Sequence, residues 1–277
     1  MTIKKGVFGI WQMYILYSAS ATCYDPSLSL ELVHYTADSY CNDRVALANW
    51  TCKDCLSPPL LNVTVVWNSS SQIQGFVGST GSSIVVAFRG SVGALDWLED
   101  FDFSLIPLPN CDGCLVAHGF YRDCFLSVWN QVQEALEVLG ARRGLPIFLT
   151  GHSLGAAIIE LTAWHMAQGS YNLSAVYTYG TPRVGNPSWA AAFASALPGI
   201  PAFRVTHFRD PVPHLPLEFQ GYFHPPTEVW YSTESGSEWR QCSGKIGEDS
   251  NCSDSILPLN PDDHNTYLGF PIDDCNS

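Results

Sequence analysis

The pentapeptide Gly151-His152-Ser153-Leu154-Gly155 constrains this chain more than any other segment. It follows the apolar residues 145–150 and precedes the apolar residues 156–168, which predict a buried strand before it and a helix after it. A serine on such a tight turn projects its hydroxyl above the edge of a sheet, and the flanking glycines let the backbone approach closely. The start of the helix adds free N–H groups and a positive dipole. The segment therefore predicts a nucleophilic serine in an α/β fold.

The rest of the chain alternates between strand-like and helix-like segments. Asp25-Pro26 predicts the start of a helix that ends near Tyr40. The interval 42–71, with its cysteines, prolines and Asn-x-Ser/Thr sequences, is interpreted as a loop, and loops are expected to dominate after Pro211. This alternation is typical of a mostly parallel sheet with helices on both faces. The remaining predicted elements are strands at 84–88, 145–150, 175–179 and 203–208 and helices at 125–139 and 156–168.

Composition excludes several classes of protein. The chain has 277 residues, of which 46% are hydrophobic and 14% are charged, so it is not a long disordered segment. The formal net charge is −13. An acidic chain lacks the basic face that nucleic acids and anionic lipid surfaces require, so no nucleic-acid partner is expected.

The N-terminal residues have the pattern of a secretory signal peptide. Lys4 and Lys5 precede a mostly apolar stretch at 6–17, and Ala19-Ser20-Ala21 fits the rule for cleavage after small residues. The apolar stretch is shorter than the roughly 20 residues of a membrane span. We expect residues 1–21 to be removed, leaving one domain over 22–277 that is secreted, or else luminal in an endomembrane compartment, and has no stable membrane span.

The cysteines and the sequons agree with secretion. Ten cysteines are present. The pairs Cys52/Cys55 and Cys111/Cys114 admit a zinc site as an alternative, but the pairs lie too far apart in sequence for a usual zinc ribbon. Disulfides are therefore expected, with Cys52–Cys55 and Cys242–Cys252 favoured by proximity. Five sequons, at Asn49, Asn62, Asn68, Asn172 and Asn251, predict N-glycosylation if the source is eukaryotic.

A nucleophilic serine needs a base and an acid that follow it in the chain. Asp210 comes directly after the predicted strand 203–208, where an acid of this kind belongs. His264, on a late loop, is the preferred base, and His214 is the weaker alternative because it lies only four residues from Asp210. His152, inside the turn, is expected to pack or to donate an internal hydrogen bond.

These segments resemble the class 3 lipase family, the secreted fungal-type triacylglycerol lipases that also include feruloyl esterases. The likeness runs in the family's order over about residues 25–275. The chain departs from better-known members by its extra cysteines Cys124, Cys242 and Cys252 and by the short Cys52–Cys55 spacing. The matching pieces are Ala87-Phe88-Arg89-Gly90-Ser91, His118-Gly119-Phe120, Gly151-His152-Ser153-Leu154-Gly155-Ala156, Tyr179-Gly180-Thr181-Pro182-Arg183-Val184-Gly185-Asn186, Asp210-Pro211-Val212-Pro213 and His264.

The resemblance implies an α/β-hydrolase-like fold and a Ser153–Asp210–His264 triad. It also implies an oxyanion hole formed by the backbone N–H groups of Leu154 and Ser91, with the Ser91 hydroxyl as a further donor. Neither a metal nor a cofactor is implied. By the same resemblance Cys41 is expected to pair with Cys275 and Cys111 with Cys114, which leaves Cys23 and Cys124 to pair with each other as one option.

The segment after Ser91 has an apolar face at near-helical spacing, formed by Val92, Leu95, Trp97 and Leu98. A core helix is one interpretation. The resemblance favours a short helical lid that covers Ser153 and opens at an oil–water interface. The expected enzyme is a monomeric lipase that cleaves lipid esters through an acyl-enzyme. A feruloyl esterase or a phospholipase A1-type esterase is the alternative, and a serine peptidase or a non-catalytic scaffold is less favoured.

Overall fold

The computed structural model describes residues 23–53, 55, 58–91, 101–141, 144–245 and 247–272. The predicted signal peptide, the predicted lid at 92–100 and Cys275 lie outside the described residues. Among the described residues, no helix is long and apolar enough to cross a bilayer.

An eight-stranded sheet forms the centre of the molecule, in the order β1-β2-β3-β6-β7-β8-β9-β10. The pairings from β3 to β9 are parallel, whereas β1–β2, β2–β3 and β9–β10 are antiparallel. Its strands are β1 (Leu61–Asn68), β2 (Ile73–Ser79), β3 (Ile84–Phe88), β6 (Ile147–His152), β7 (Leu173–Tyr179), β8 (Ala202–His207), β9 (Glu228–Tyr231) and β10 (Trp239–Gln241). Two small hairpins pair β4 (Leu105–Pro107) with β5 (Leu115–Ala117) and β11 (Thr266–Tyr267) with β12 (Phe270–Pro271).

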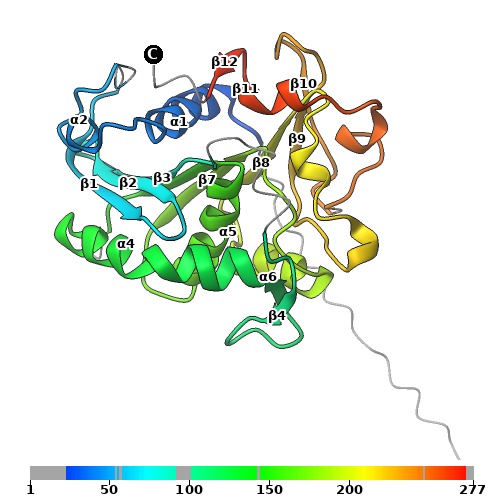
Figure 1. The fold of residues 1–277 in the computed structure, drawn as a ribbon, viewed down its shortest axis with the longest axis horizontal. Coiled ribbons are helices and arrows are strands. Elements are labelled where there is room, and N and C mark those ends of the chain that lie inside the picture. Colours follow the sequence, from blue (N-terminus) through cyan, green and yellow to red (C-terminus); the bar gives the residue numbers. More distant parts are fainter. Residues whose placement is uncertain are drawn as a thin grey trace, which may run out of the picture.

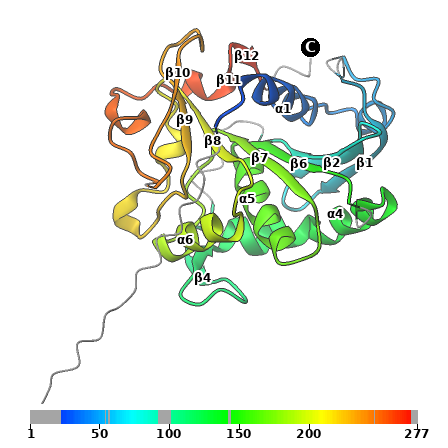
Figure 2. The ribbon, with the colours of Figure 1, turned by 180° about the vertical axis from the view of Figure 1, so that it is seen from behind.

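Helices cover both faces of this sheet (Figure 1). The helix α1 lies on one face and contacts β3, β6 and β7, while α4 and α5 pack on the other, and the view from behind shows the same layers (Figure 2). Each face has its own apolar core. The helices are α1 (Pro26–Asp38), α2 (Arg44–Ala48), α4 (Leu126–Val138), α5 (Leu154–Ala167) and α6 (Pro187–Ala196), with a π-helix η1 (Gly119–Phe125) and 3-10 turns η3 (Val212–His214), η4 (Glu218–Gln220), η5 (Ser253–Ser255) and η6 (Pro261–Asn265).

The structure confirms the predicted fold class and most predicted elements. Asp25 caps α1 by accepting hydrogen bonds from the backbone of Ser27 and Leu28, as the Asp-Pro pair predicted. The interpretation of 42–71 as a loop is wrong, because α2 and the whole of β1 lie within it. The β-branched residues of β1 favour an extended backbone, but its half-exposed, polar-flanked sequence lacks the apolar continuity of a central strand.

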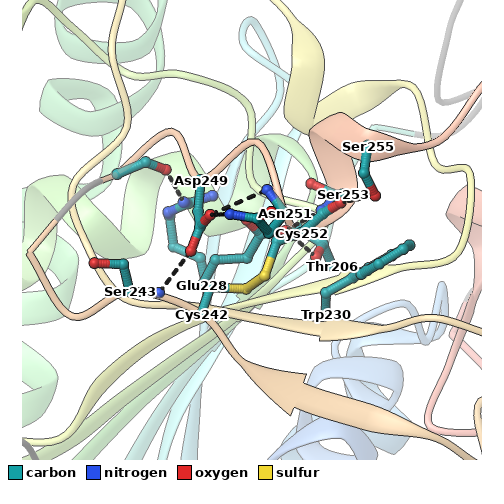
Figure 3. Close-up of a disulfide and its surroundings, with 12 residues drawn as sticks. Thr206, Glu228, Trp230, Cys242, Ser243, Asp249, Asn251, Cys252, Ser253 and Ser255 are labelled. Carbon is teal, nitrogen blue, oxygen red and sulfur yellow. Dashed lines mark hydrogen bonds between the residues drawn. A yellow bond between two sulfur atoms is a disulfide. The ribbon is translucent and has the colours of Figure 1, made fainter.

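Three disulfides are present among the described cysteines: Cys52–Cys55, Cys111–Cys114 and Cys242–Cys252. They confirm three predicted pairs. Cys242–Cys252 ties β10 to the late loop beside Glu228, whose carboxylate accepts hydrogen bonds from the Thr206 hydroxyl and the Ser253 N–H (Figure 3).

The optional prediction that Cys23 pairs with Cys124 is wrong, because neither cysteine is in a disulfide. Cys124 lies in the apolar core that holds α4 and α5. Cys23 is exposed and precedes Tyr24, which belongs to the core on the opposite face of the sheet. The sheet therefore separates the two thiols. The Cys41–Cys275 pairing stays a prediction.

Candidate active site

Ser153 stands at the sharp turn between β6 and α5, as its sequence predicted. Its backbone has φ +54°, a left-handed conformation that is uncommon and strained for a residue with a side chain. Gly155 lets the helix start against β3, because a Cβ there would collide with the carbonyl oxygens of Phe88 and Arg89. The side chain of Ser153 is fully buried in this conformation.

Asp210 and His264 form a buried pair although 54 residues separate them. Asp210 follows the end of β8, and His264 lies in η6. The Nδ1 atom of His264 is 2.8 Å from Oδ2 and 3.0 Å from Oδ1 of Asp210. Tyr267 donates its hydroxyl proton to Oδ2, and the Val212 N–H donates to Oδ1 at 2.8 Å. The carboxylate therefore fixes one nitrogen of the ring and leaves Nε2 facing away from it.

These contacts set the charge of Asp210. Burial alone raises the pKa of a carboxyl group, but the charge of His264 and the hydrogen bonds from His264, Tyr267 and Val212 outweigh it and lower the pKa of Asp210 below its ordinary value. Burial and the adjacent carboxylate raise the pKa of Tyr267 well above its ordinary value. Asp210 is therefore ionised at neutral pH, and Tyr267 keeps the proton that it donates.

Gly180, from the predicted Tyr179-Gly180-Thr181 segment, makes room for the pair. Its φ is +57°, and a Cβ there would lie 2.8 Å from Cε1 of His264 and 3.0 Å from Oδ2 of Asp210. A side chain at this position would therefore push the imidazole and the carboxylate apart.

His152 connects this pair to the loop after β3. Its Nε2 lies 2.9 Å from the carbonyl oxygen of His264, which can only accept, so Nε2 carries the proton. Nδ1 then accepts from the Tyr40 hydroxyl at 2.6 Å, and the same hydroxyl accepts from the Gly90 N–H at 2.9 Å. Burial, then the charge of His264, lowers the pKa of His152 well below its ordinary value, so the ring stays neutral. The predicted internal hydrogen bond of His152 is confirmed.

His207, at the end of β8, holds the segment just before His264. Its Nδ1 lies 2.9 Å from the carbonyl oxygen of Asp263, and its Nε2 lies 3.2 Å from that of Glu234. The carbonyl oxygens of Asp263 and His264 are thus each contacted by a histidine ring from a different strand end.

His214, the weaker candidate for the base, lies elsewhere. Its Nδ1 is 3.1 Å from Asp254, and its carbonyl oxygen accepts from the Arg183 guanidinium at 2.6 Å. Arg183 also pairs in a two-pronged manner with Glu248, at 2.8 and 2.9 Å. The structure therefore brings His264, not His214, to Asp210.

The oxyanion candidates lie on both sides of Ser153. Leu154 is the first residue of α5, where backbone N–H groups have no partner within the helix. The loop carrying Ser91 touches the nucleophile candidate, since a Cβ on Gly90 would lie 2.7 Å from Cβ of Ser153. Ser153 Oγ and His264 Nε2 are both buried and make no hydrogen bond within the described part of the chain. The predicted lid residues Val92, Leu95, Trp97 and Leu98 lie outside it.

Sequence reasoning missed Tyr40, His207 and Tyr267. Tyr267 left one local signal, its position three residues after His264. Tyr40 and His207 contact residues that lie 112 and 56 positions away in the sequence. No local sequence pattern predicts contacts over such separations.

This chain is similar in sequence and in structure to known proteins. The family model for lipase (class 3) matches residues 85–220. A lipase from Rhizomucor miehei is 33% identical over 252 residues, covering 87% of this chain and 68% of that protein. A secreted mono- and diacylglycerol lipase A from Penicillium cyclopium is 35% identical over 188 residues, covering 66% of this chain and 60% of its own length.

A solved triacylglycerol lipase, whose catalytic centre is described as a serine protease triad, superposes with a TM-score of 0.78. It is 30% identical, and the match covers 90% of this chain and 96% of that one. The α/β-hydrolase fold that the resemblance implied is thereby confirmed. By its sequence, its fold and the segments around Ser153, this chain belongs to the class 3 lipase family.

Proposed function

We propose that this protein is a secreted triacylglycerol lipase that cleaves lipid esters through an acyl-enzyme. Ser153 is the nucleophile, His264 the general base and Asp210 the acid that orients it. The observation that carries the proposal is the buried Asp210–His264 pair, 2.8 Å apart, in the same site as the strained serine turn. The names of the relatives, among them a triacylglycerol lipase and a mono- and diacylglycerol lipase, support the substrate class.

The reaction follows from the charges of this site. Ser153 Oγ attacks the ester carbonyl carbon while its proton passes to Nε2 of His264. Asp210, ionised because its pKa is lowered, holds Nδ1–H and stabilises the imidazolium. The proton then goes to the departing alcohol oxygen, the carbon–oxygen bond breaks, and an acyl-enzyme remains. Water, activated by the same imidazole, releases the free acid and restores the serine.

The negative oxygen of the tetrahedral intermediate binds the backbone N–H groups of Leu154 and Ser91, with the Ser91 hydroxyl as a third donor. One such donor typically contributes about 3–4 kcal/mol to transition-state stabilisation. A series of hydrogen bonds supports this assignment. It runs from the Gly90 N–H through the Tyr40 hydroxyl and the His152 ring to the backbone of His264, and it fixes the loop beside Ser91 relative to the base.

The lid interpretation of 92–100 belongs to the same proposal. Val92, Leu95, Trp97 and Leu98 would close over Ser153 and turn to lipid at an oil–water interface. We further propose that residues 1–21 are cleaved as a signal peptide, and that 22–277 acts outside the cell as a single-domain monomer.

An ester panel tests the proposal. Purified protein is assayed on emulsified triacylglycerol, a short-chain p-nitrophenyl ester, a phospholipid and a feruloyl ester. We expect the highest rate on the triacylglycerol emulsion. Fastest turnover of the feruloyl ester or of the phospholipid would instead establish the alternative that each represents.

Ser153→Ala is the matched control for the panel. Removal of the hydroxyl should lower kcat by about 10⁴–10⁶-fold on every ester while the circular dichroism spectrum stays that of the wild type. Residual activity near the wild-type level in a folded Ser153→Ala protein would overturn the assignment of the nucleophile.

A further inference from the structure

The two edges of the central sheet differ in length. β10 has three residues, whereas β1, at the opposite edge, has eight (Figure 1). β1 reads Leu-Asn-Val-Thr-Val-Val-Trp-Asn, without a charged residue or proline. A long, uncharged edge strand rich in β-branched residues is a template for pairing with another chain. A secreted protein with such an edge needs a device that keeps other strands away.

One end of β1 is already covered. The side chain of Gln131, from α4, accepts from the N–H of Trp67 and donates to its carbonyl oxygen, both at 3.1 Å. The Arg44 guanidinium lies 4.3 Å from the centre of the Trp67 ring. These contacts occupy the outward backbone groups at Trp67. They do not extend to the other end of the strand, where the register of β1 shifts between Leu61 and Thr64.

Asn62 lies in that irregular end. Its φ is +51°, and both Asn62 and Thr64 are exposed. Asn62-Val63-Thr64 is a sequon for N-glycosylation, in which the glycan joins the Asn Nδ2 atom. Within the part of the chain that the structure describes, no hydrogen bond occupies the Asn62 carboxamide, and the residue is exposed at the uncovered end of the edge.

Most other sequons differ in this respect. The Asn68 carboxamide oxygen accepts from the backbone of Ser70 and Ser71 in the β1–β2 turn. Asn172 Nδ2 donates to the carbonyl oxygen of Gly144 at 2.8 Å. Asn251 Nδ2 donates to Asp249 beside the Cys242–Cys252 bridge (Figure 3). Asn49 is exposed at the end of α2, which packs on β1.

We propose that Asn62 carries an N-linked glycan and that this glycan shields the open edge of β1 from pairing with other chains. The inference rests on the proposed passage through a eukaryotic secretory pathway, but not on the lipase activity. A glycan is bulky and strongly hydrated. At Asn62 it blocks the approach of a second strand to the half of β1 that Gln131 and Arg44 leave open.

Site occupancy is the first test. The full chain is secreted from a yeast host, and the glycans are removed by an amidase in heavy-oxygen water, which converts each formerly occupied Asn to a labelled Asp. Mass spectrometry of the peptides should show the label at Asn62 in most molecules. An unlabelled Asn62 in protein secreted from that host would overturn the proposal.

Two substitutions of Thr64 separate loss of the glycan from loss of a side chain. Thr64→Ser keeps the sequon, and Thr64→Ala destroys it while leaving Asn62 in place. Light scattering at equal concentration and mild heating should show that Thr64→Ala self-associates several-fold faster than Thr64→Ser. Ser174→Ala, which removes the Asn172 sequon on a distant loop, is the control and should behave like the wild type.

Trimming the glycans of folded wild-type protein with an endoglycosidase provides a second measurement if Thr64→Ala fails to fold. Trimmed protein should self-associate faster than untreated protein, and trimmed Thr64→Ser should behave the same way. Equal rates for trimmed and untreated protein, or for Thr64→Ala and Ser174→Ala, would overturn the shielding role. Because these measurements do not use ester hydrolysis, their failure is distinct from failure of the proposed activity.

Discussion

Two carboxyl groups near the serine turn are equally buried, and the fold treats them in opposite ways. Asp210 is 2% exposed and Glu160, in α5 two turns after Ser153, is 1% exposed. Asp210 receives hydrogen bonds from His264, Tyr267 and Val212. Both oxygens of Glu160 lack a hydrogen-bond partner among the described residues. Partners therefore lower the pKa of Asp210, whereas burial without them raises the pKa of Glu160 to about 8.

The surroundings of Glu160 explain its isolation. It faces a small cavity whose lining includes Thr178, Phe193 and Arg204. The charge of Arg204 lowers the pKa of Glu160 but does not offset its burial. The Arg204 guanidinium donates instead to the carbonyl oxygens of Pro225 and Gly247, at 2.9 and 2.8 Å. The comparison teaches that hydrogen-bond partners, rather than depth, decide whether a buried carboxyl group here is charged.

Asp210→Asn removes the charge of a carboxylate that three hydrogen bonds stabilise. We expect the largest loss of activity from this substitution. An amide fits the same space but does not stabilise the imidazolium of His264, so kcat should fall by about 10⁴-fold. Steady-state hydrolysis of a soluble ester measures the loss, with circular dichroism as the check on folding. A folded variant within about tenfold of wild type would remove Asp210 from the proposed triad.

Asp210→Asn is expected to impair the enzyme, whereas Glu160→Gln is expected to stabilise the folded protein at neutral and alkaline pH. With a folded pKa of about 8 against an ordinary 4.5, Glu160 does not penalise folding below pH 4.5, where both states are protonated. As the pH rises from 4.5 to 8, only the unfolded state loses its proton, so the folded state is destabilised by up to roughly 4–5 kcal/mol, and the loss levels off above pH 8. Glutamine lacks this titration, so the variant should match wild type at acidic pH and be clearly more stable at pH 9.

Urea unfolding at several pH values between 4 and 9 measures the difference for Glu160→Gln. Glu134→Gln, at an exposed position of α4, is the matched control for the same exchange of side chains. If the stability of Glu160→Gln falls between pH 4.5 and 8 as steeply as that of the wild type, Glu160 is not an uncompensated buried carboxyl group. Asp210 has the opposite sign: its lowered pKa makes its contribution disappear as the pH falls.

The difference between these two groups marks how far sequence reasoning reached. Buried parallel strands are continuous apolar runs, and a serine turn needs glycine, so β3, β6 and the position of Ser153 could be predicted from local pattern. Asp210 could be placed because it follows a strand. The partners that set its pKa, Tyr267 among them, come from contacts across the fold, and nothing local predicts that Glu160 has none.

The edge strand β1 shows the same limit for the fold. A central strand such as β3 is buried along its whole length, whereas only Val66 of β1 is fully buried. Its exposed and half-exposed positions allow polar residues and sequons, which resemble a loop in the sequence. The pairing of β1 with β2 therefore had to be seen in the structure.

Tyr267→Phe makes Asp210 more like Glu160, because it removes one of the hydrogen-bond partners of Asp210. A hydrogen bond to a charged group contributes about 1.5–3 kcal/mol, so kcat should fall by roughly tenfold or more. The loss of this donor should also raise the pKa of Asp210 toward its ordinary value, and steady-state hydrolysis of a soluble ester at several pH values gives the profile of each variant. Tyr179→Phe is the control, because that buried hydroxyl donates to the Ser29 carbonyl oxygen instead. Equal profiles for both variants would contradict a specific role of Tyr267.

His207→Phe should have the smallest effect, because its ring touches the backbone beside the base rather than the base or the acid. The substitution removes the contacts with the carbonyl oxygens of Asp263 and Glu234. An imidazole with one N–H donates to only one of these two carbonyl oxygens. At about 0.5–1.5 kcal/mol for that hydrogen bond, kcat should fall several-fold with little change in KM, because only the position of the His264 loop loosens. His207→Gln keeps an amide donor for one carbonyl oxygen and should recover part of kcat. If His207→Gln is no better than His207→Phe, or if KM rather than kcat changes, the ring contributes packing and does not position the base.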